Sequence, residues 1–563
     1  MVKKFFQLLH KEIGGLHEAA YLLAVFALAS QVLGIVRDRF LASMFGAGRE
    51  LDIYYAAFRI PDFIFVTVAS LVSISVLVPF LSLRLERDKN EAREFIDHTF
   101  SFFSILIAAV SIGAFILMPV ISPKIFSGFT DPSDMERLIL LSRMLLLSPI
   151  LLGISNFFAS ITQLHKRFFV YALAPVLYNA GIIIGIVALA PIYGNIGIVY
   201  GVILGAALHC LIQIPFIIKE ELFPTFRFPI RLDRIRDVVA LSIPRTLALA
   251  VSHIAVLVLV GFASFMAEGS ISVFNFSWNL QSVPLTIIGM SYSLAAFPVL
   301  SSFFARGERD KFLGEMIVAA RHIIFWSMPL TALFIVLRAQ VVRTILGASQ
   351  NFDWNDTRLT AAALALFTIS VLAQGIVLLF VRGFYASGNT KTPLYANLFS
   401  AGAIIVASVW FSAVFASSEF FRGFIESLLR VEGISGTEVL VLPLAYSVGM
   451  ILNAVIIWIL FERAFGGFSR PVLATLYHSI AASVVMGVAS YIGLNIFDGV
   501  FDLSTVIGVF LQGFCAGIVG IAVGILMLKL LGNQEISEVL ETLHRKIWRV
   551  KVVGPDATEN VSL

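Results

Sequence analysis

The fold is decided by residues 21–62, which read YLLAVFALASQVLGIVRDRFLASMFGAGRELDIYYAAFRIPD. An uncharged, largely apolar run over 21–36 leads directly into Arg37-Asp38-Arg39, and a second apolar run holds Asp52, Arg59 and Asp62. Ionisable groups at membrane depth are costly unless they pair, are hydrated or face a cavity. The stretch therefore predicts membrane-spanning helices that line a path for a polar cargo.

The composition of the whole chain agrees with this prediction. The 563 residues are 59% hydrophobic and 13% charged, whereas soluble domains carry about 25% charged residues. The mean hydropathy is +0.93. Apolar runs of about 20 residues recur to the end of the chain, which is the length that a membrane-spanning helix needs. We predict an all-α polytopic membrane protein, and the net charge of +4 is explained by topology, not by a nucleic-acid partner.

Charged breaks between the apolar runs divide the chain into 14 predicted spans. They lie near 21–43, 53–82, 97–121, 138–163, 168–190, 195–217, 238–264, 270–302, 313–336, 358–381, 392–414, 438–462, 471–494 and 504–531. One set of alternate connecting segments and the tails holds 26 Lys and Arg, Arg382 among them, and the opposite set holds eight. Cytoplasmic segments carry the excess of positive charge, so both termini are predicted to be cytoplasmic.

The chain also carries a weak internal repeat. Asp52-Ile-Tyr-Tyr-Ala-Ala-Phe58 has a counterpart in Ser272-Val-Phe-Asn-Phe-Ser277. Six predicted spans separate the copies, so two six-helix lobes would share one orientation, with the substrate site between them. The predicted divisions are a cytoplasmic amphipathic N-terminus (1–20), an N-terminal lobe (21–218), a cytoplasmic linker (219–237), a C-terminal lobe (238–414 plus 415–462), two extra spans (471–531) and a cytoplasmic amphipathic tail (532–563).

The charged residues of the first two spans are the main candidates for a site. Arg37 and Arg59 are predicted to bind an anionic group in a cavity, because guanidinium is a planar, permanently charged donor fork that suits phosphate. Asp38 and Asp62 would tune or gate these arginines. The alternative is that the charges at 37–39 extend to the interface and pair for structural reasons.

Motifs for catalysis are absent from the sequence. It has no phosphate-binding Walker loop, no metal-ligand spacing and no nucleophile–base motif. We predict a transporter, not an enzyme, with no cofactor and no metal site.

Several motifs together resemble the MurJ (MviN) lipid II flippases of the multidrug/oligosaccharidyl-lipid/polysaccharide exporter superfamily. They are Arg37-Asp38, Phe45-Gly-Ala-Gly48, Asp52, Ala57-Phe-Arg-Ile-Pro61, Val78-Pro79, Ala174-Pro175 with Asn179, Gly201–His209, Gln213-Ile-Pro215, Phe262-Ala-Ser-Phe265, Gly383-Phe-Tyr-Ala386 and Lys391-Thr-Pro393. The resemblance covers about residues 21 to 530.

This resemblance implies a flippase of the bacterial plasma (inner) membrane. Its cargo would be lipid II, the undecaprenyl-pyrophosphate-linked precursor of peptidoglycan, moved from the inner to the outer leaflet by alternating access for cell-wall synthesis. It implies that Arg37 contacts the head group, that Arg59 is a further basic position, and that Asp38 and Asp52 are gating carboxylates. We expect a monomer whose partners are the lipid-linked substrate and the membrane lipids.

The sequence departs from the family pattern where further arginines are expected. Gln31, Phe65, Val66 and Asn279 stand at those positions, and Ser70-Leu71 replaces a glutamate–glycine pair. Gln31 and Asn279 are therefore candidate neutral contacts for the head group. The departures keep two alternative functions open: a flippase for another lipid-linked oligosaccharide, or a multidrug-type antiporter. A membrane scaffold or an enzyme of polyprenyl lipids is a further class.

Overall fold

The computed structural model describes residues 16–71, 77, 80–82, 84–85, 88–165, 167–347, 349–539 and 541. In the first part of the chain the helices are α2 (Leu16–Phe45), α3 (Arg49–Leu71), α5 (Lys89–Ile125), α6 (Pro132–Leu145), α7 (Leu147–Leu164), α8 (Phe168–Ile184), η1 (Gly185–Leu189), α9 (Ala190–Tyr193), α10 (Asn195–Leu211) and α11 (Ile214–Lys219). They continue with α12 (Leu232–Ala263), α13 (Ser270–Pro284), η2 (Leu285–Met290), α14 (Ser291–Ala305), α15 (Arg309–Val336), α16 (Arg338–Leu346), α17 (Trp354–Thr368) and α18 (Val371–Ala386). The last are α19 (Lys391–Ser417), α20 (Glu419–Leu429), η3 (Thr437–Leu440), α21 (Val441–Phe465), α22 (Ser469–Asp498) and α23 (Val506–Leu530).

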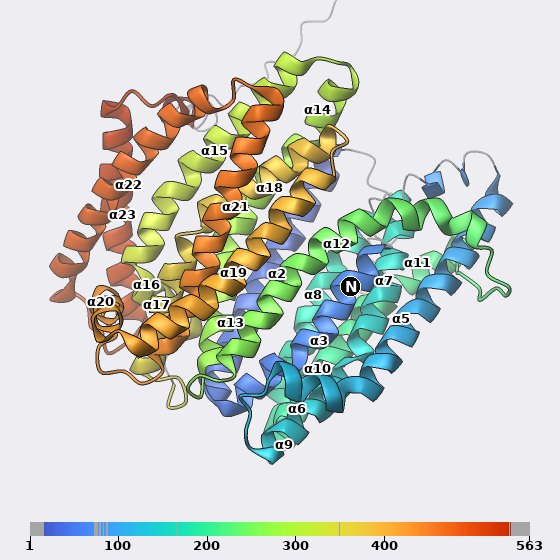
Figure 1. The fold of residues 1–563 in the computed structure, drawn as a ribbon, viewed down its shortest axis with the longest axis horizontal. Helices are drawn as coiled ribbons and strands as arrows, with labels where there is room; N and C mark the ends of the chain where they lie inside the picture. The colour runs from blue at the N-terminus through green and yellow to red at the C-terminus, as the bar shows by residue number, and fades with distance from the viewer. Residues whose placement is uncertain are drawn as a thin grey trace, which may run out of the picture.

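The predicted all-α membrane architecture is confirmed. Ten of the described helical segments are long and apolar enough to cross a membrane, and an eleventh follows if α17 and α18, bent by 40° at their junction, form one span. Three more long helices, α2, α3 and α12, run beside them in the same bundle (Figure 1). The exact count of 14 spans and the lobe boundaries stay predictions.

The two ends of the bundle are packed differently. We call them the α20 end, where α9, α20 and the turn between α12 and α13 lie, and the α14 end, where α11 and α14 lie (Figure 1). At the α20 end one hydrophobic core joins α3 and α12 to α13, α17 and α21. At the α14 end there are two separate cores: the one around Phe461 lies within the second half of the chain, and the one around Phe95 is formed by the first half together with Val238 of α12. The halves are therefore closed against each other at the α20 end.

Glycines allow α8 and α10 to pack in backbone contact. Gly197, Gly201 and Gly205 recur every four residues on α10, opposite Gly181 and Gly185 of the α8–η1 helix. A Cβ atom added to Gly201 would lie 2.5 Å from the Cα of Gly185. Small residues at this spacing are what membrane helices use for close approach.

Gly201→Leu is accordingly expected to destabilise the protein, because the new side chain meets main-chain atoms that cannot move aside. We expect a loss of about 3 kcal/mol or more, at the upper end of overpacking effects. Thermal unfolding of the purified protein in detergent measures it. The control is Gly113→Leu on α5, where an added Cβ meets nothing within 4 Å; equal melting temperatures for the two variants would contradict the packing argument.

The segment after α23 turns back onto the bundle. Glu535 is 3% exposed, and its carboxylate accepts hydrogen bonds from Arg321 of α15 and Thr475 of α22. Burial alone would raise the pKa of Glu535, but hydrogen bonds from the main chain, Arg321 and Thr475 lower it. A charged carboxylate thus anchors this segment. Most of the predicted amphipathic N-terminus, and the tail after residue 541, lie outside the described residues.

Candidate functional site

A cavity of about 400 Å³ lies between the two halves of the chain. Helices α3, α12, α13, α18, α19 and α21 all contribute to its wall. Its polar and aromatic lining residues are Arg59, Asp62, Ser252, His253, Trp278, Gln374, Arg382, Tyr385, Asn397, Ser400, Tyr446 and Asn453. Within the described residues, no group of three or more His, Cys, Asp or Glu side chains is placed to hold a metal ion. The cavity is suited to an organic, polar ligand.

Of the two arginines predicted to bind an anionic group, Arg37 and Arg59, it is Arg59 that lines this cavity. It lies on α3 within the predicted membrane depth, and its Nη2 donates a hydrogen bond to Oδ1 of Asn275 on α13. The Nδ2 of Asn275 is held by the carbonyl of Ile271, 2.6 Å away. In the described part of the chain, the buried Nε of Arg59 has no hydrogen-bond partner. A buried donor without a partner is costly, so an anionic group entering the cavity would be stabilised here.

Asp62 and His253 face each other in the same cavity. Asp62 lies one turn beyond Arg59 on α3, and its Oδ2 is 3.8 Å from Nδ1 of His253 on α12. Arg382 lies in the last turns of α18 with its guanidinium over the ring of Phe297, 5.4 Å from the ring centroid. Two arginines and one aspartate therefore make the cavity cationic when the histidine is neutral.

The remaining predicted binding residues lie elsewhere, at the crossing of α2 and α13. Arg37 donates through Nε and Nη2 to Oδ1 of Asp38, at 3.0 and 2.8 Å. The other carboxylate oxygen of Asp38 accepts a hydrogen bond from Nδ2 of Asn279 at 2.9 Å. Gln31, Asp38 and Asn279 surround a separate cavity of about 70 Å³. Gln31, Arg37 and Asn279 do not line the cavity of Arg59, and substrate binding by these three residues stays a prediction.

Asp52 forms a third contact, at the α20 end. Its side chain is 3% exposed and accepts hydrogen bonds from the main-chain N–H groups of Gly269 and Ser272, both at 2.7 Å. The hydroxyl of Ser272 donates to the same carboxylate at 2.7 Å. A carboxylate at the first turn of α13 also meets the positive end of the helix dipole. Asp52 and Ser272 are counterparts in the internal repeat, and they meet where the two halves close.

Further polar contacts hold the α12–α13 turn at this end. The carboxylate of Glu268 accepts a hydrogen bond from the main-chain N–H of Arg49, which joins the two halves, and that of Glu438 accepts one from Ala267 within the second half, both at 2.9 Å. The side chain of Asn351 donates to the carbonyl of Met44 at 2.8 Å. We call the contacts of Asp52, Glu268 and Glu438 the outer latch. All three carboxylates bind main-chain N–H groups.

Several cavity residues were not predicted as site residues from the sequence. Gln374 accepts a hydrogen bond from the Tyr446 hydroxyl at 3.2 Å, and Asn453 donates to Asn397 at 3.1 Å. Arg382 was assigned to a connecting segment, because the predicted span ended at 381, but α18 continues to Ala386. The spacing of Gln374, Leu378, Arg382 and Tyr385 places them on one helical face, which is the signal that would have identified them.

A family model described as "Lipid II flippase MurJ" matches residues 41–511 of the chain. The chain is 29% identical to a probable lipid II flippase MurJ of Haemophilus influenzae over 384 residues, which is 65% of this chain and 75% of that protein. It is 25% identical to a probable lipid II flippase MurJ of Thermotoga maritima over 512 residues, or 91% and 96% of the two chains. Among solved structures, a lipid II flippase MurJ in an inward closed conformation matches with a TM-score of 0.71 and 22% identity, covering 94% of this chain and all of that one. A multidrug MATE transporter in an inward-facing conformation matches with a TM-score of 0.61 and 15% identity, covering 78% and 96%.

Proposed function

This chain belongs to the lipid II flippase MurJ family, and we propose that it moves lipid II from the inner to the outer leaflet of the bacterial plasma membrane. The lipid-linked head group would enter the cavity between the halves, while its polyprenyl tail stays in the bilayer. The single observation that carries this proposal is Arg59, a half-buried cation on the wall of that cavity whose Nε has no partner among the described residues. The phosphates of the head group would pair with its guanidinium.

The packing of the two ends supports alternating access as the mechanism. The continuous core and the outer latch hold the α20 end closed, whereas the cavity extends from Arg59 to Arg382 and Tyr385 toward the α14 end. Opening at the α20 end would require the latch to break and the α14 end to close. The π-helical segment η2, which follows Pro284 and contributes Leu285 to the cavity wall, is a suitable hinge.

The orientation follows from the distribution of charge. We propose that the α14 end faces the cytoplasm, because the connecting segments predicted to carry most Lys and Arg lie there. Both termini would then be cytoplasmic, and the outer latch would be the gate on the far side. The protein would act as a monomer, in which Asp38, Asp52 and Asp62 regulate the conformational change and no catalysis takes place.

Complementation of a bacterial strain depleted of its own lipid II flippase tests the proposal. We expect the unmutated protein to restore growth and normal cell shape. Its level in the membrane is measured in parallel with a C-terminal tag, so that failure to insert is recognised. Lysis of cells that contain the inserted protein would defeat the assignment of lipid II as the cargo.

One observation favours a second candidate, a flippase for another lipid-linked oligosaccharide. The positions of Gln31, Phe65, Val66 and Asn279 lack the arginines that the resemblance implies, and among the described residues only Arg59 and Arg382 bring arginine to the cavity. A cargo with less negative charge would suit this set. Rescue of a strain that lacks its lipid-linked oligosaccharide flippase, without rescue of lipid II flippase depletion, would favour this candidate.

A further inference from the structure

The short helix α20 presents an apolar row that no other described part of the chain covers. Phe420, Phe424 and Leu428 recur every four residues and are 84%, 55% and 61% exposed. The neighbouring row of the helix is packed: Phe421 stacks on Phe411 of α19 at 6.1 Å between ring centroids, and Ile425 and Leu429 are buried. An amphipathic helix of this kind lies in the membrane interface with its apolar face in the lipid.

The position of α20 in the chain places it at that interface. It begins two residues after α19, a candidate span, and is followed by η3 and α21, which form another. The exposed side chains of Val406, Val409 and Trp410 continue the apolar surface along α19. Tryptophan is enriched at the level of the lipid head groups. The apolar row of α20 is therefore continuous with the lipid-facing surface of the bundle.

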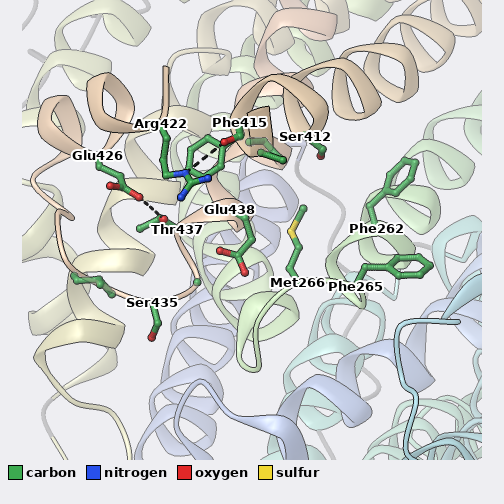
Figure 2. A pocket seen from close by; sticks show the side chains of 14 residues that line it. Phe262, Phe265, Met266, Ser412, Phe415, Arg422, Glu426, Ser435, Thr437 and Glu438 are labelled. Carbon is green, nitrogen blue, oxygen red and sulfur yellow. Dashed lines mark hydrogen bonds between the residues drawn. The ribbon is translucent and has the colours of Figure 1, made fainter. Parts of the chain in front are cut away.

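A cavity of about 640 Å³ lies directly beside α20. Figure 2 shows its wall, with Phe262, Phe265 and Met266 on one side and Arg422, Glu426 and Thr437 on the other. Glu438 lies between the two sides. The apolar residues come from α12 and the α12–α13 turn, and the charged ones from α20 and η3. The cavity is thus amphipathic and lies at the predicted outer interface.

Its charges indicate the class of ligand. The Nε of Arg422 donates to the carbonyl of Phe415 at 3.4 Å, and its terminal nitrogens donate no hydrogen bond to the described part of the chain. Glu426 and Glu438 each use one carboxylate oxygen, for the Thr437 hydroxyl at 2.6 Å and the Ala267 N–H at 2.9 Å. The terminal nitrogens of Arg422 can bind a phosphate group, and the free carboxylate oxygens of Glu426 and Glu438 can bind an ammonium group. A ligand that carries both groups side by side would match the cavity.

We propose that this cavity binds a zwitterionic aminophospholipid of the outer leaflet, with the phosphate on Arg422 and the ammonium group on Glu426 and Glu438. The acyl chains would lie against the phenylalanines and the apolar row of α20. Because Glu438 also holds Ala267 in the α12–α13 turn, the bound lipid braces the outer latch. This binding site is distinct from the central cavity, and its test requires no transport.

Native mass spectrometry of the full-length protein tests the site. The protein is reconstituted in nanodiscs of equimolar phosphatidylethanolamine and phosphatidylglycerol and released into detergent, and the retained lipids are counted. We expect the unmutated protein to retain phosphatidylethanolamine selectively. Glu438→Gln should lower the ratio of phosphatidylethanolamine to phosphatidylglycerol about tenfold, because it removes a charge-assisted hydrogen bond to the ammonium group. Arg422→Gln should lower the retention of both lipids about tenfold, because both carry the phosphate that it binds.

Two further variants separate the site from general effects. Arg137→Gln removes an exposed arginine at the same end of the bundle, which pairs with Glu50, and should leave the ratio unchanged. Ser412→Phe fills the cavity but alters no charge, and it should abolish selective retention even if the charge variants fold poorly. Equal retention of the two lipids by the unmutated protein, or unchanged selectivity in Ser412→Phe, would overturn the proposal.

Discussion

Arg59→Ala is expected to abolish rescue of a strain depleted of its lipid II flippase. Arg59 is the cation on the cavity wall whose Nε lacks a partner, and it is joined to α13 through Asn275. Losing a charge-assisted, two-pronged contact to phosphate should weaken head-group binding about 100-fold. The binding of lipid II to the purified protein, measured by native mass spectrometry, provides the second readout. Arg59→Lys retains the charge without the planar fork and should bind with intermediate affinity.

The matched control for this variant is Arg143→Ala. Arg143 also lies in a predicted span, but its Nε donates to the carbonyl of Phe115 at 3.0 Å and its guanidinium stacks on the Phe115 ring. It does not line the central cavity. Growth rescue by Arg143→Ala should therefore equal that of the unmutated protein. If Arg59→Ala bound lipid II as tightly as Arg143→Ala, the head-group role of Arg59 would be refuted.

Asp52→Ala is expected to open the α20 end of the central cavity. It removes the acceptor of two main-chain N–H groups and one hydroxyl, and each buried donor left without a partner costs about 1–3 kcal/mol. A loss of about 3 kcal/mol in the closed state would change the ratio of closed to open molecules about 100-fold. The measurement is the labelling rate of Ser252→Cys, on the cavity wall, by a membrane-impermeant maleimide added from the outer side. Cys210 and Cys515 are first replaced by alanine.

Glu50→Ala is the control for the latch. Glu50 lies two residues from Asp52, but its carboxylate is exposed and pairs with Arg137 at 2.8 Å, within the N-terminal half of the chain. Removing it should leave the labelling rate unchanged. Asp52→Asn retains one acceptor oxygen and should label at an intermediate rate. Identical rates for Asp52→Ala and Glu50→Ala would show that Asp52 does not hold the end closed.

The sequence predicted the class of fold well, because the length of apolar runs is a local property of the chain. It predicted less of the site. Arg59 and Asp62 do line the central cavity, but Arg37 is turned toward Asp38 and Asn179. Which face of a membrane helix meets a partner depends on the packing of helices far apart in sequence. Arg37 and Arg59 lie on successive helices, and only the tertiary structure shows that Arg59 lines the central cavity and Arg37 does not.

One of the positions that lack an expected arginine, Asn279, and its neighbour Asn275 have clear roles in the structure. Asn275 and Asn279 lie one turn apart on α13 and contact Arg59 and Asp38 respectively. An amide can accept from a guanidinium or donate to a carboxylate, so each asparagine is a neutral partner for one ionised neighbour. This pairing could not be read from the sequence, because the contacts join residues more than 200 positions apart.

The outer latch joins side-chain carboxylates to main-chain N–H groups. A mutation at a carboxylate residue removes the acceptor, whereas most mutations at a donor residue leave its N–H group in place. Every amino acid except proline carries the donor, so the side chains of Ala267 and Ser272 can be exchanged with the N–H donors in place. The carboxylates of Asp52 and Glu438 have no such redundancy. Ala267 and Ser272 therefore tolerate any residue that keeps the N–H, so proline is excluded there, whereas Gly269 has a φ of +87° and no room for a Cβ beside Ala47, and it must stay glycine.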